Sequence, residues 1–341
     1  MSSFADLRHA ATVAGLVRPA VRLALLRGGL QDGVFAELTE LRTAAEFAES
    51  RGVDRGLAAS WLRAATAAGW LERRGNAYVS APFVRWLLDT EAGDAGRAML
   101  EEAVLAYEPI LGTYPERMRH GDRPRWSDDP EAAARVARGS RVIEGRALKA
   151  LFRIPGARGA RRVLDVGCGE GVYLARLLVR HRDSLGDGVE LDPVVAARAR
   201  SRLAAAGVQR RAEIHVGDFT EIDLPHGMYD LVLLNNNIYY FADEEREPLF
   251  ERILRHLSPR GILAIQSPVI SDDPISRWLG ITAMNASFDA FLRIHQDLAG
   301  LPEPDALRAQ LRSAGFESVG SVPIVPGGSI RFVWARKARG S

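Results

Sequence analysis

Strands and helices alternate along the second half of the chain, as the order of hydrophobic and polar positions indicates. From residue 161 onward, short apolar runs of strand type alternate with longer amphipathic stretches. This alternation predicts an α/β fold with a parallel, doubly wound sheet. The expected strands are residues 161–167, 186–192, 212–218, 229–235 and 261–267, and the expected helices between them are 172–182, 193–207 and 243–258. A helix at 305–316 and two strands at 318–325 and 328–336 complete the pattern.

The first part of the chain, residues 1–90, has a different pattern that predicts a separate, mainly helical domain. Apolar residues recur at i, i+3 and i+4 in residues 44–53 and 55–75, as in helices with one buried face. A short strand, a turn at Gly75 and Asn76, a second strand and a helix are expected next. Helices followed by a β-hairpin are the outline of a winged helix.

The middle part, residues 91–158, is predicted to be a helical linker. Prolines, glycines and an Asp-Asp pair indicate a loop at 112–130. Tyr107, Tyr114, Trp126 and Arg141 lie in or near this part. They are candidates for substrate contact by location alone, and core packing is the alternative for each.

The stretch "VLDVGCGEG" carries the strongest chemical signal. An apolar strand ends at Asp165, and Gly167, Gly169 and Gly171 open the next helix, where the backbone can approach a ligand closely. A dinucleotide site spaces its glycines G-x-G-x-x-G, whereas the spacing here is G-x-G-x-G. An aspartate two residues before the first glycine is a poor neighbour for a pyrophosphate. It suits a ligand with a positively charged amino-acid end, although another nucleotide-binding α/β fold is the alternative.

Two further strand ends supply partners for a nucleoside. Glu190 closes the second strand in "GVELDP", where a carboxylate accepts hydrogen bonds from ribose hydroxyls. The third strand ends in "VGDF", where Asp218 can accept from an adenine amino group while Phe219 packs on the ring. An amino acid, a ribose and an adenine together describe S-adenosylmethionine (SAM).

The motifs "VLDVGCGEG", "GVELDP", "VGDF" and "YDLVLLNNN" resemble those of class I SAM-dependent methyltransferases. The resemblance covers about residues 160–337 and implies a Rossmann-like, seven-stranded sheet with an antiparallel strand inserted near its end. It implies a SAM-binding domain at 159–341. The residues that the resemblance places against SAM are Asp165, Gly167, Cys168, Gly169 and Gly171 at the methionine end, Glu190 and Leu191 at the ribose, and Gly217, Asp218 and Phe219 at the adenine.

The N-terminal part resembles, more loosely, the winged-helix dimerisation domain of small-molecule O-methyltransferases. Residues 30–38, 42–53 and 57–88 follow the order of elements in that family. The resemblance implies a homodimer in which residues 91–158 form the roof of the active site.

The segment "LVLLNNNIYYF", residues 231–241, departs from the family at its catalytic position. Tyr239 falls where those O-methyltransferases have a histidine that acts as general base, and an unperturbed tyrosine pKa of about 10 makes it a poor base at neutral pH. We expect Asn235 to contact SAM, Asn236 and Tyr239 to act at the reaction centre, and Tyr240 to contact the substrate. His295 is a further candidate base from a lid helix. The alternatives are a polar turn for the asparagines, packed aromatic rings for the tyrosines and a solvated helix face for His295.

Charge and cysteine usage narrow the function classes. Residues 1–90 carry eleven Arg against nine Asp plus Glu, so no basic stripe indicates a nucleic-acid partner. Cys168 is the only cysteine, which fits a reducing compartment. Arginines interrupt the apolar N-terminus, so we expect no signal peptide, no membrane span and a cytoplasmic protein. No metal site is expected.

Three functions follow in order of preference. The first is SAM-dependent methylation of a small molecule, such as a specialised metabolite, at an N, C or O atom that needs no strong base. The second is a SAM-using enzyme that does not methylate but releases methylthioadenosine by intramolecular displacement or cyclisation. The third is a winged-helix, DNA-binding regulator that senses SAM.

Overall fold

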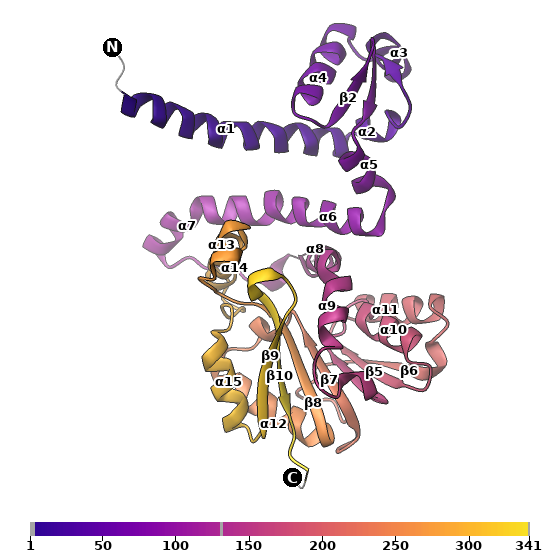
Figure 1. The fold of residues 1–341 in the computed structure, drawn as a ribbon, viewed down its shortest axis with the longest axis vertical. Helices are drawn as coiled ribbons and strands as arrows, with labels where there is room; N and C mark the ends of the chain where they lie inside the picture. Colours follow the sequence, from indigo (N-terminus) through magenta and orange to yellow (C-terminus); the bar gives the residue numbers. More distant parts are fainter. Residues whose placement is uncertain (1–3, 130–131, 340–341) are drawn as a thin grey trace. The chain divides into compact units, whose positions relative to one another are not determined.

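The computed structural model describes residues 4–129 and 132–339 and contains two compact units, Met1–Arg97 and Ala98–Ser341 (Figure 1). Residues 98–158, predicted as a linker, belong to the same compact unit as the large sheet. The two units are described separately below.

The N-terminal unit combines helices with a small antiparallel sheet in the strand order β1-β3-β2. Its elements are α1 (Phe4–Gln31), α2 (Val34–Glu37), β1 (Arg42–Thr43), α3 (Ala44–Arg51), α4 (Arg55–Ala67), β2 (Leu71–Arg74), β3 (Ala77–Ser80) and α5 (Pro82–Asp89). The predicted hairpin is confirmed: β2 pairs with β3, and Gly75 takes the positive φ of 65° that the turn needs. Strand β1 was not predicted, because a strand of two residues is too short to show an alternating pattern of apolar and polar positions.

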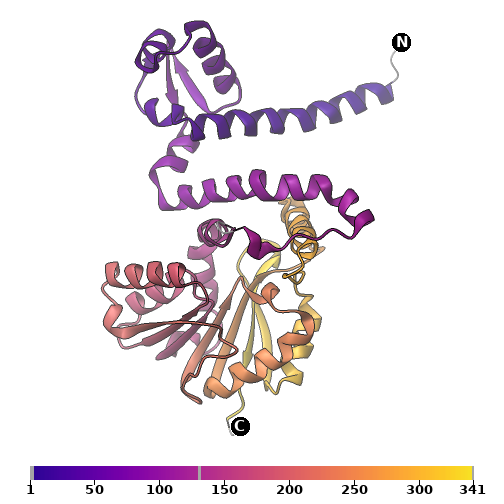
Figure 2. The same ribbon diagram turned by 180° about the vertical axis from the view of Figure 1, so that it is seen from behind.

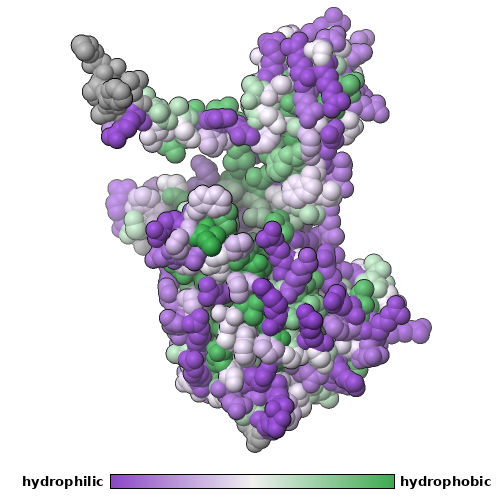
Figure 3. Space-filling model, viewed as in Figure 1, coloured by the Kyte–Doolittle hydropathy of each residue, from purple (hydrophilic) through white to green (hydrophobic). Residues whose placement is uncertain are grey.

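Helix α1 is the least buried long element of this unit. Val13, Leu16, Val17 and Val21 are each more than half exposed, and hydrophobic residues follow the helix in Figure 3. By length and composition, the part Arg8–Gln31 is long and apolar enough to cross a membrane. No such segment was predicted from the sequence, but the arginines are spaced widely enough to leave an apolar window between them.

The C-terminal unit is built on a seven-stranded sheet in the order β6-β5-β4-β7-β8-β10-β9. Its strands are β4 (Arg162–Val166), β5 (Leu185–Glu190), β6 (Ala212–Val216), β7 (Tyr229–Asn235), β8 (Leu257–Pro268), β9 (Ser318–Pro323) and β10 (Ile330–Arg336). Strands β4 to β8 are parallel, and β10 runs antiparallel between β8 and β9. The predicted fold class and the inserted antiparallel strand are both confirmed.

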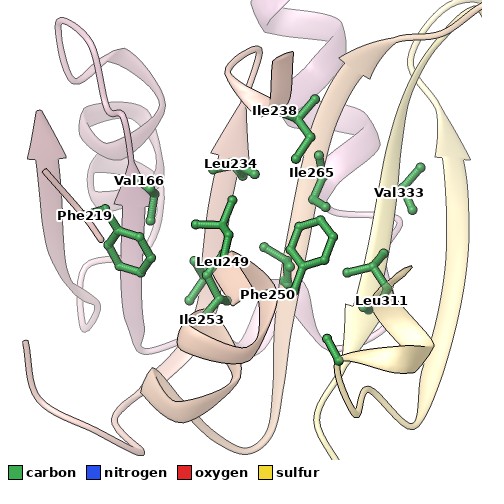
Figure 4. Packing of buried hydrophobic residues seen from close by; sticks show 14 of the residues in the cluster. Val166, Phe219, Leu234, Ile238, Leu249, Phe250, Ile253, Ile265, Leu311 and Val333 are labelled. Carbon is green, nitrogen blue, oxygen red and sulfur yellow. The ribbon is translucent and has the colours of Figure 1, made fainter. Parts of the chain in front are cut away.

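Helices cover both faces of this sheet (Figures 1 and 2). They are α9 (Glu144–Leu151), α10 (Val172–Arg180) and α11 (Pro193–Ala205) on one face, and α12 (Asp243–His256) and α15 (Pro304–Ser313) on the other. Strand β7 is apolar at successive positions because both of its faces are buried. Val232 and Leu234 belong to the hydrophobic cluster under α12, while Leu231 and Leu233 belong to the cluster on the other face of the sheet. Figure 4 shows Leu234, Leu249 and Phe250 in the first cluster.

The remaining helices lie before the sheet and between β8 and β9. They are α6 (Glu91–Glu102), a π-helical turn η1 (Ala103–Tyr107), α7 (Glu108–His120), the turns η2 (Trp126–Asp128) and η3 (Ser140–Ile143), α8 (Ala132–Gly139), α13 (Pro274–Trp278) and α14 (Ile281–Ile294). The prediction of a loop at 112–130 was wrong for its first half, which is helical. Helix α7 continues through Pro115, and Gly121, with a φ of 67°, ends it.

Candidate active site

A cavity of about 660 Å³ opens in the C-terminal unit where β4, β5, β6 and β7 end. Parallel sheets bind ligands outside the carboxyl ends of their strands, where the chain order reverses. Thirteen of the predicted site residues line it: Arg141, Asp165, Gly167, Cys168, Gly169, Glu190, Leu191, Gly217, Asp218, Phe219, Asn235, Asn236 and Tyr240.

The glycine loop is held closely against the end of β7. Gly167 has a φ of 63°, and a Cβ on it would lie 2.4 Å from Nδ2 of Asn237. That Nδ2 donates to the carbonyl oxygen of Val166 at 2.5 Å. Only glycine therefore combines this backbone conformation with this approach. Asn237 ties the ends of β4 and β7 together.

Asp165 is the most enclosed acid of the cavity, with 1% of its surface exposed. Asn235 Nδ2 donates to its Oδ1 at 3.3 Å. Burial raises the pKa of Asp165 to about 7; the Asn235 bond lowers it and the nearby Glu190 charge raises it further. The side-chain oxygens of Asn235 and Asn237 are buried and have no hydrogen-bond partner within the described residues. Unpaired buried acceptors of this kind suit a ligand that carries N–H donors.

Glu190 links the glycine loop to the start of α11. One carboxylate oxygen accepts from the backbone N–H of Gly169 at 2.8 Å, and the other accepts from that of Asp192 at 3.1 Å. These bonds fix the carboxylate at the end of β5 and leave lone pairs for further donors. This arrangement is compatible with the expected ribose contact.

Of the two residues predicted to contact the adenine, one lies at the surface and the other in the core. Asp218 is exposed, and its Oδ1 accepts from the backbone N–H and the hydroxyl of Thr220 at 2.7 and 2.8 Å. Phe219 is buried, with the guanidinium of Arg252 over its ring and the His256 ring beside it. Phe219 also belongs to the cavity lining.

The surroundings of Cys168 favour a structural role over a nucleophilic one. Burial, reinforced by Asp165 and Glu190, raises the pKa of its thiol, and its N–H donates to Val189 at 2.9 Å. A protonated thiol is a poor nucleophile.

Arg141, predicted to contact the substrate, lines the cavity beside the glycine loop. It forms an ion pair with Glu170 of the glycine loop. Its Nε is buried without a hydrogen-bond partner within the described residues.

Trp126 and Tyr240 form an aromatic wall of the cavity. The Trp126 side chain is hydrogen-bonded to Tyr240; burial raises the pKa of Tyr240 to about 12 although this bond lowers it. The Trp126 ring meets Phe291 edge-on at a centroid distance of 5.8 Å. Its backbone N–H donates to Asp297 Oδ1 at 2.7 Å.

Two of the three residues predicted as catalytic do not line this cavity. Tyr239 is 3% exposed and packs against Tyr240 and Phe288, and burial raises its pKa well above the ordinary value. His295 is not on a solvated helix face: it is 5% exposed and bonded through Nδ1 to the Phe291 carbonyl. Burial lowers the pKa of His295, which keeps its ring neutral.

Three other predicted residues also lie outside the cavity lining. Gly171 caps the start of α10 with a φ of 70°. Tyr107 packs its ring on Phe291 at 4.6 Å between centroids, and Tyr114 lies partly buried on α7.

The cavity lining also includes residues that the sequence did not predict, among them Glu144, Glu170 and Tyr173. Glu170 lies inside the glycine motif and Tyr173 follows it closely, so their position was a usable signal. Glu144 lies on α9, far from any motif, and nothing in the sequence indicated it.

The residues present fit the SAM that the resemblance implies. The cavity offers a carboxylate and two unpaired amide oxygens to an ammonium, an arginine N–H to a carboxylate, and Glu190 and Asp218 to a nucleoside. One end is therefore arranged for an amino acid and the other for a ribose and a base.

Comparison with known proteins agrees with this geometry. Residues 163–261 match the family described as a methyltransferase domain. This part of the chain is a methyltransferase domain. The domain contains β4, β5, β6 and β7, whose ends border the cavity, and the glycine loop.

Curated proteins that resemble the chain include an O-methyltransferase from Streptomyces. The 3-hydroxy-5-methyl-1-naphthoate 3-O-methyltransferase of Streptomyces sahachiroi is 30% identical over 176 residues, which are 50% of this chain and 49% of that enzyme. The chain thus spans about half the length of this curated relative.

Solved structures share the fold over the full length. An O-methyltransferase family protein from Burkholderia thailandensis aligns with a TM-score of 0.78 and 23% identity, covering 100% of both chains. Human N-acetylserotonin methyltransferase in complex with SAM aligns with a TM-score of 0.74 and 16% identity, covering 99% of both chains.

Proposed function

We propose that this protein is a SAM-dependent methyltransferase that methylates a small molecule, such as a specialised metabolite. The observation that carries the proposal is the cavity of the methyltransferase domain, with an acidic and amide-lined end beside the glycine loop and an aromatic wall. The named relative and the SAM-bound neighbour support the same reaction class.

In this proposal, different residues of the chain bind different parts of the cofactor. Asp165, Asn235 and Asn237 receive the ammonium of the methionine end, and Arg141 receives its carboxylate. Glu190 holds the ribose hydroxyls, while Asp218 and the edge of Phe219 meet the adenine.

SAM supplies a methyl group that its sulfonium already activates. The protein's main contribution is therefore to align the acceptor with that methyl group, and alignment can lower a barrier by roughly 7–11 kcal/mol. Trp126, Tyr240 and Asn236 border the cavity and are the proposed walls of the acceptor site.

The acceptor is proposed to be an amine, an enol or a stabilised carbanion. Within the described part of the chain, no histidine lines the cavity. Tyr239, the residue at the family's histidine position, is buried with a raised pKa. An acceptor that needs no strong base fits these groups.

The alternative reaction, release of methylthioadenosine, uses the same methionine end. Asp165, whose pKa is raised to about 7 by burial, would accept a proton from the ligand's ammonium, and the amide oxygens would orient the resulting amine. SAM would supply the electrophilic γ-carbon for that amine, and methylthioadenosine would be the leaving group. Methyl transfer remains preferred because the aromatic wall provides a place for a second substrate.

We propose a cytoplasmic location and a homodimer in which the second copy covers the exposed apolar face of α1. A small molecule is the proposed partner, and nucleic acid is not. The winged-helix regulator would require salt-dependent binding to duplex DNA.

Binding of S-adenosylhomocysteine (SAH) to purified protein, freed of bound nucleoside, tests the cofactor assignment. Calorimetry is expected to show one site per chain. Glu190→Gln should weaken SAH binding by about tenfold or more, because a charge-assisted bond to the ribose is lost. Glu251→Gln, an exposed acid on α12, is the control. Absence of SAH binding would overturn the proposal.

A further inference from the structure

Glu170 is surrounded by three arginines. Its side chain is 11% exposed, and its carboxylate pairs with Arg141 and with Arg202 Nη2 at 3.1 Å. Arg198 Nη1 lies 3.6 Å from the other oxygen. The backbone carbonyl of Glu170 also accepts from Arg202 Nε at 3.1 Å. One acid of the glycine loop thus joins η3, which precedes the sheet, to helix α11.

Of the three arginines around Glu170, Arg141 is the one that lines the cavity. Its side chain is 13% exposed, and its buried Nε has no hydrogen-bond partner within the described residues. A guanidinium held by one edge can present its other donors, in a fixed plane, to a second carboxylate.

Helix α11 holds Glu170 in place, so that Glu170 does not move when Arg141 moves. The two bonds from Arg202 to the carbonyl and the carboxylate of Glu170 fix both its backbone and its side chain. Arg141 is therefore oriented by an acid that is itself anchored on the sheet domain.

We propose that Glu170 is a positioning residue that orients Arg141 toward the carboxylate of the cofactor's methionine end. The inference rests on the proposed function, because it takes SAM as the ligand. It makes η3 part of the cofactor site, so that binding of the cofactor's carboxylate also fastens η3 to the glycine loop.

Paired ligands that differ only in the amino-acid part test this role. SAH carries the carboxylate, and methylthioadenosine lacks the whole amino-acid end. Glu170→Gln and Arg141→Met are each expected to weaken SAH binding by about tenfold, as loss of one oriented charge-assisted contact does. Methylthioadenosine affinity, measured by calorimetry, should stay unchanged in both variants. The double variant should bind SAH no more weakly than Arg141→Met, because Glu170 acts through Arg141.

Controls separate this inference from the proposed function. Glu101→Gln removes an acid that pairs with Arg138 at 3.1 Å outside the cavity, and it should leave both affinities unchanged. If the unaltered protein fails to bind SAH, the proposed function fails. If it binds SAH but Glu170→Gln binds equally well, or loses SAH and methylthioadenosine alike, the positioning role is overturned.

A second variant guards against misfolding. Should Glu170→Gln lower the melting temperature sharply, Glu170→Asp keeps the charge but is too short to bridge the same arginines. It is expected to retain methylthioadenosine affinity and lose several-fold in SAH affinity. Unchanged SAH affinity in Glu170→Asp would contradict the inference.

Discussion

Asp165 lies with Asn235 and Asn237 at the proposed methionine end of the cavity, and the three side chains have complementary roles. The amide nitrogens are occupied by strand β4, through the Asp165 carboxylate and the Val166 carbonyl. The amide oxygens and the acid remain for a ligand. A buried acid with no cation beside it is destabilised when it ionises, and a ligand ammonium removes that penalty.

Binding of SAH should therefore release protons near pH 6.5. Asp165 is largely protonated there in the free protein, because burial raises its pKa to about 7. The ligand's ammonium favours the ionised form, so we expect release of roughly half to one proton per site. Calorimetry in two buffers with different ionisation enthalpies measures this number. Asp165→Asn should abolish the buffer dependence, and a buffer-independent enthalpy in the unaltered protein would refute the assignment.

The same group gives the ligand-free protein a defined pH dependence. The folded protein holds the Asp165 proton more tightly than the unfolded chain, whose aspartate pKa is 3.8. The free energy of unfolding should fall as pH rises from about 4 to about 7. Denaturant titration should show a smaller decline in Asp165→Asn, and an equal decline in both proteins would contradict the role of Asp165.

Gly167 and Gly169 provide a matched pair of backbone substitutions. Both have positive φ, 63° and 54°, but only at Gly167 would a Cβ collide with Asn237. Left-handed backbone costs an alanine about 1–2 kcal/mol, and displacing a buried hydrogen bond adds about 1–3 kcal/mol. Gly167→Ala should therefore lower the melting temperature more than Gly169→Ala. Equal losses would show that the Asn237 contact does not matter.

The spacing of these glycines and the acids at the strand ends was readable in the sequence, because their chemistry is local. Thirteen predicted residues do line one cavity. The pairing of Arg141 with Glu170, 29 residues away, was not predicted, because the contact depends on the fold. Tyr239 and His295 looked available for chemistry, but packing against Phe288 and Phe291 buries them, and no local pattern encodes that contact.

At the level of elements, the segment that carries Trp126 is fastened to the end of α14. Asp297 accepts from the backbone N–H groups of Trp126 and Ser127 at 2.7 and 3.0 Å, and these bonds hold its pKa below the ordinary value against the effect of burial. Gln296 N–H donates to the Pro124 carbonyl at 2.9 Å. The aromatic wall is thus positioned from two distant parts of the sequence.

Removing the Asp297 carboxylate should loosen this wall. In Asp297→Ala, hydrogen exchange at Trp126 and Ser127 is expected to accelerate by about tenfold or more, since each loses a charge-assisted bond. Exchange mass spectrometry on the full chain measures it. Asp305→Ala, which removes an exposed acid paired with Arg308, should leave the segment unchanged. Unaltered exchange in Asp297→Ala would show that other contacts hold Trp126.

Where the apolar runs were long, their periodicity and composition predicted whether they form helices or strands. The sheet strands and the hairpin at Gly75 were predicted on that basis. The continuation of α7 through Pro115 was not, because proline is a helix breaker in the sequence rules and only tertiary packing overrides it.

At the scale of the whole molecule, two apolar surfaces lack cover within their own units. One is the face of α1. The other contains Ile275, Trp278 and Leu279 around α13, where hydrophobic residues gather in Figure 3. Exposed apolar patches of this kind indicate association.

The proposed homodimer predicts a specific response on α1. Leu16 is 71% exposed, and Leu16→Glu should convert the dimer to a monomer, since a charge would be buried without a partner. Light scattering after size-exclusion chromatography gives the mass. Leu57→Glu, at a residue 73% exposed on α4, is the control and should leave the dimer intact. A monomeric unaltered protein would contradict the dimer.

The product formed from SAM tests the central claim most directly. The full chain is incubated with methyl-labelled SAM and a panel of aromatic amines, enols and phenols, and both nucleosides and labelled small molecules are identified by mass spectrometry. We expect SAH in equal amount to a methylated acceptor, and we expect both to be lost in Asp165→Ala. Methylthioadenosine as the enzymatic product, with no label transferred to any acceptor, would contradict it.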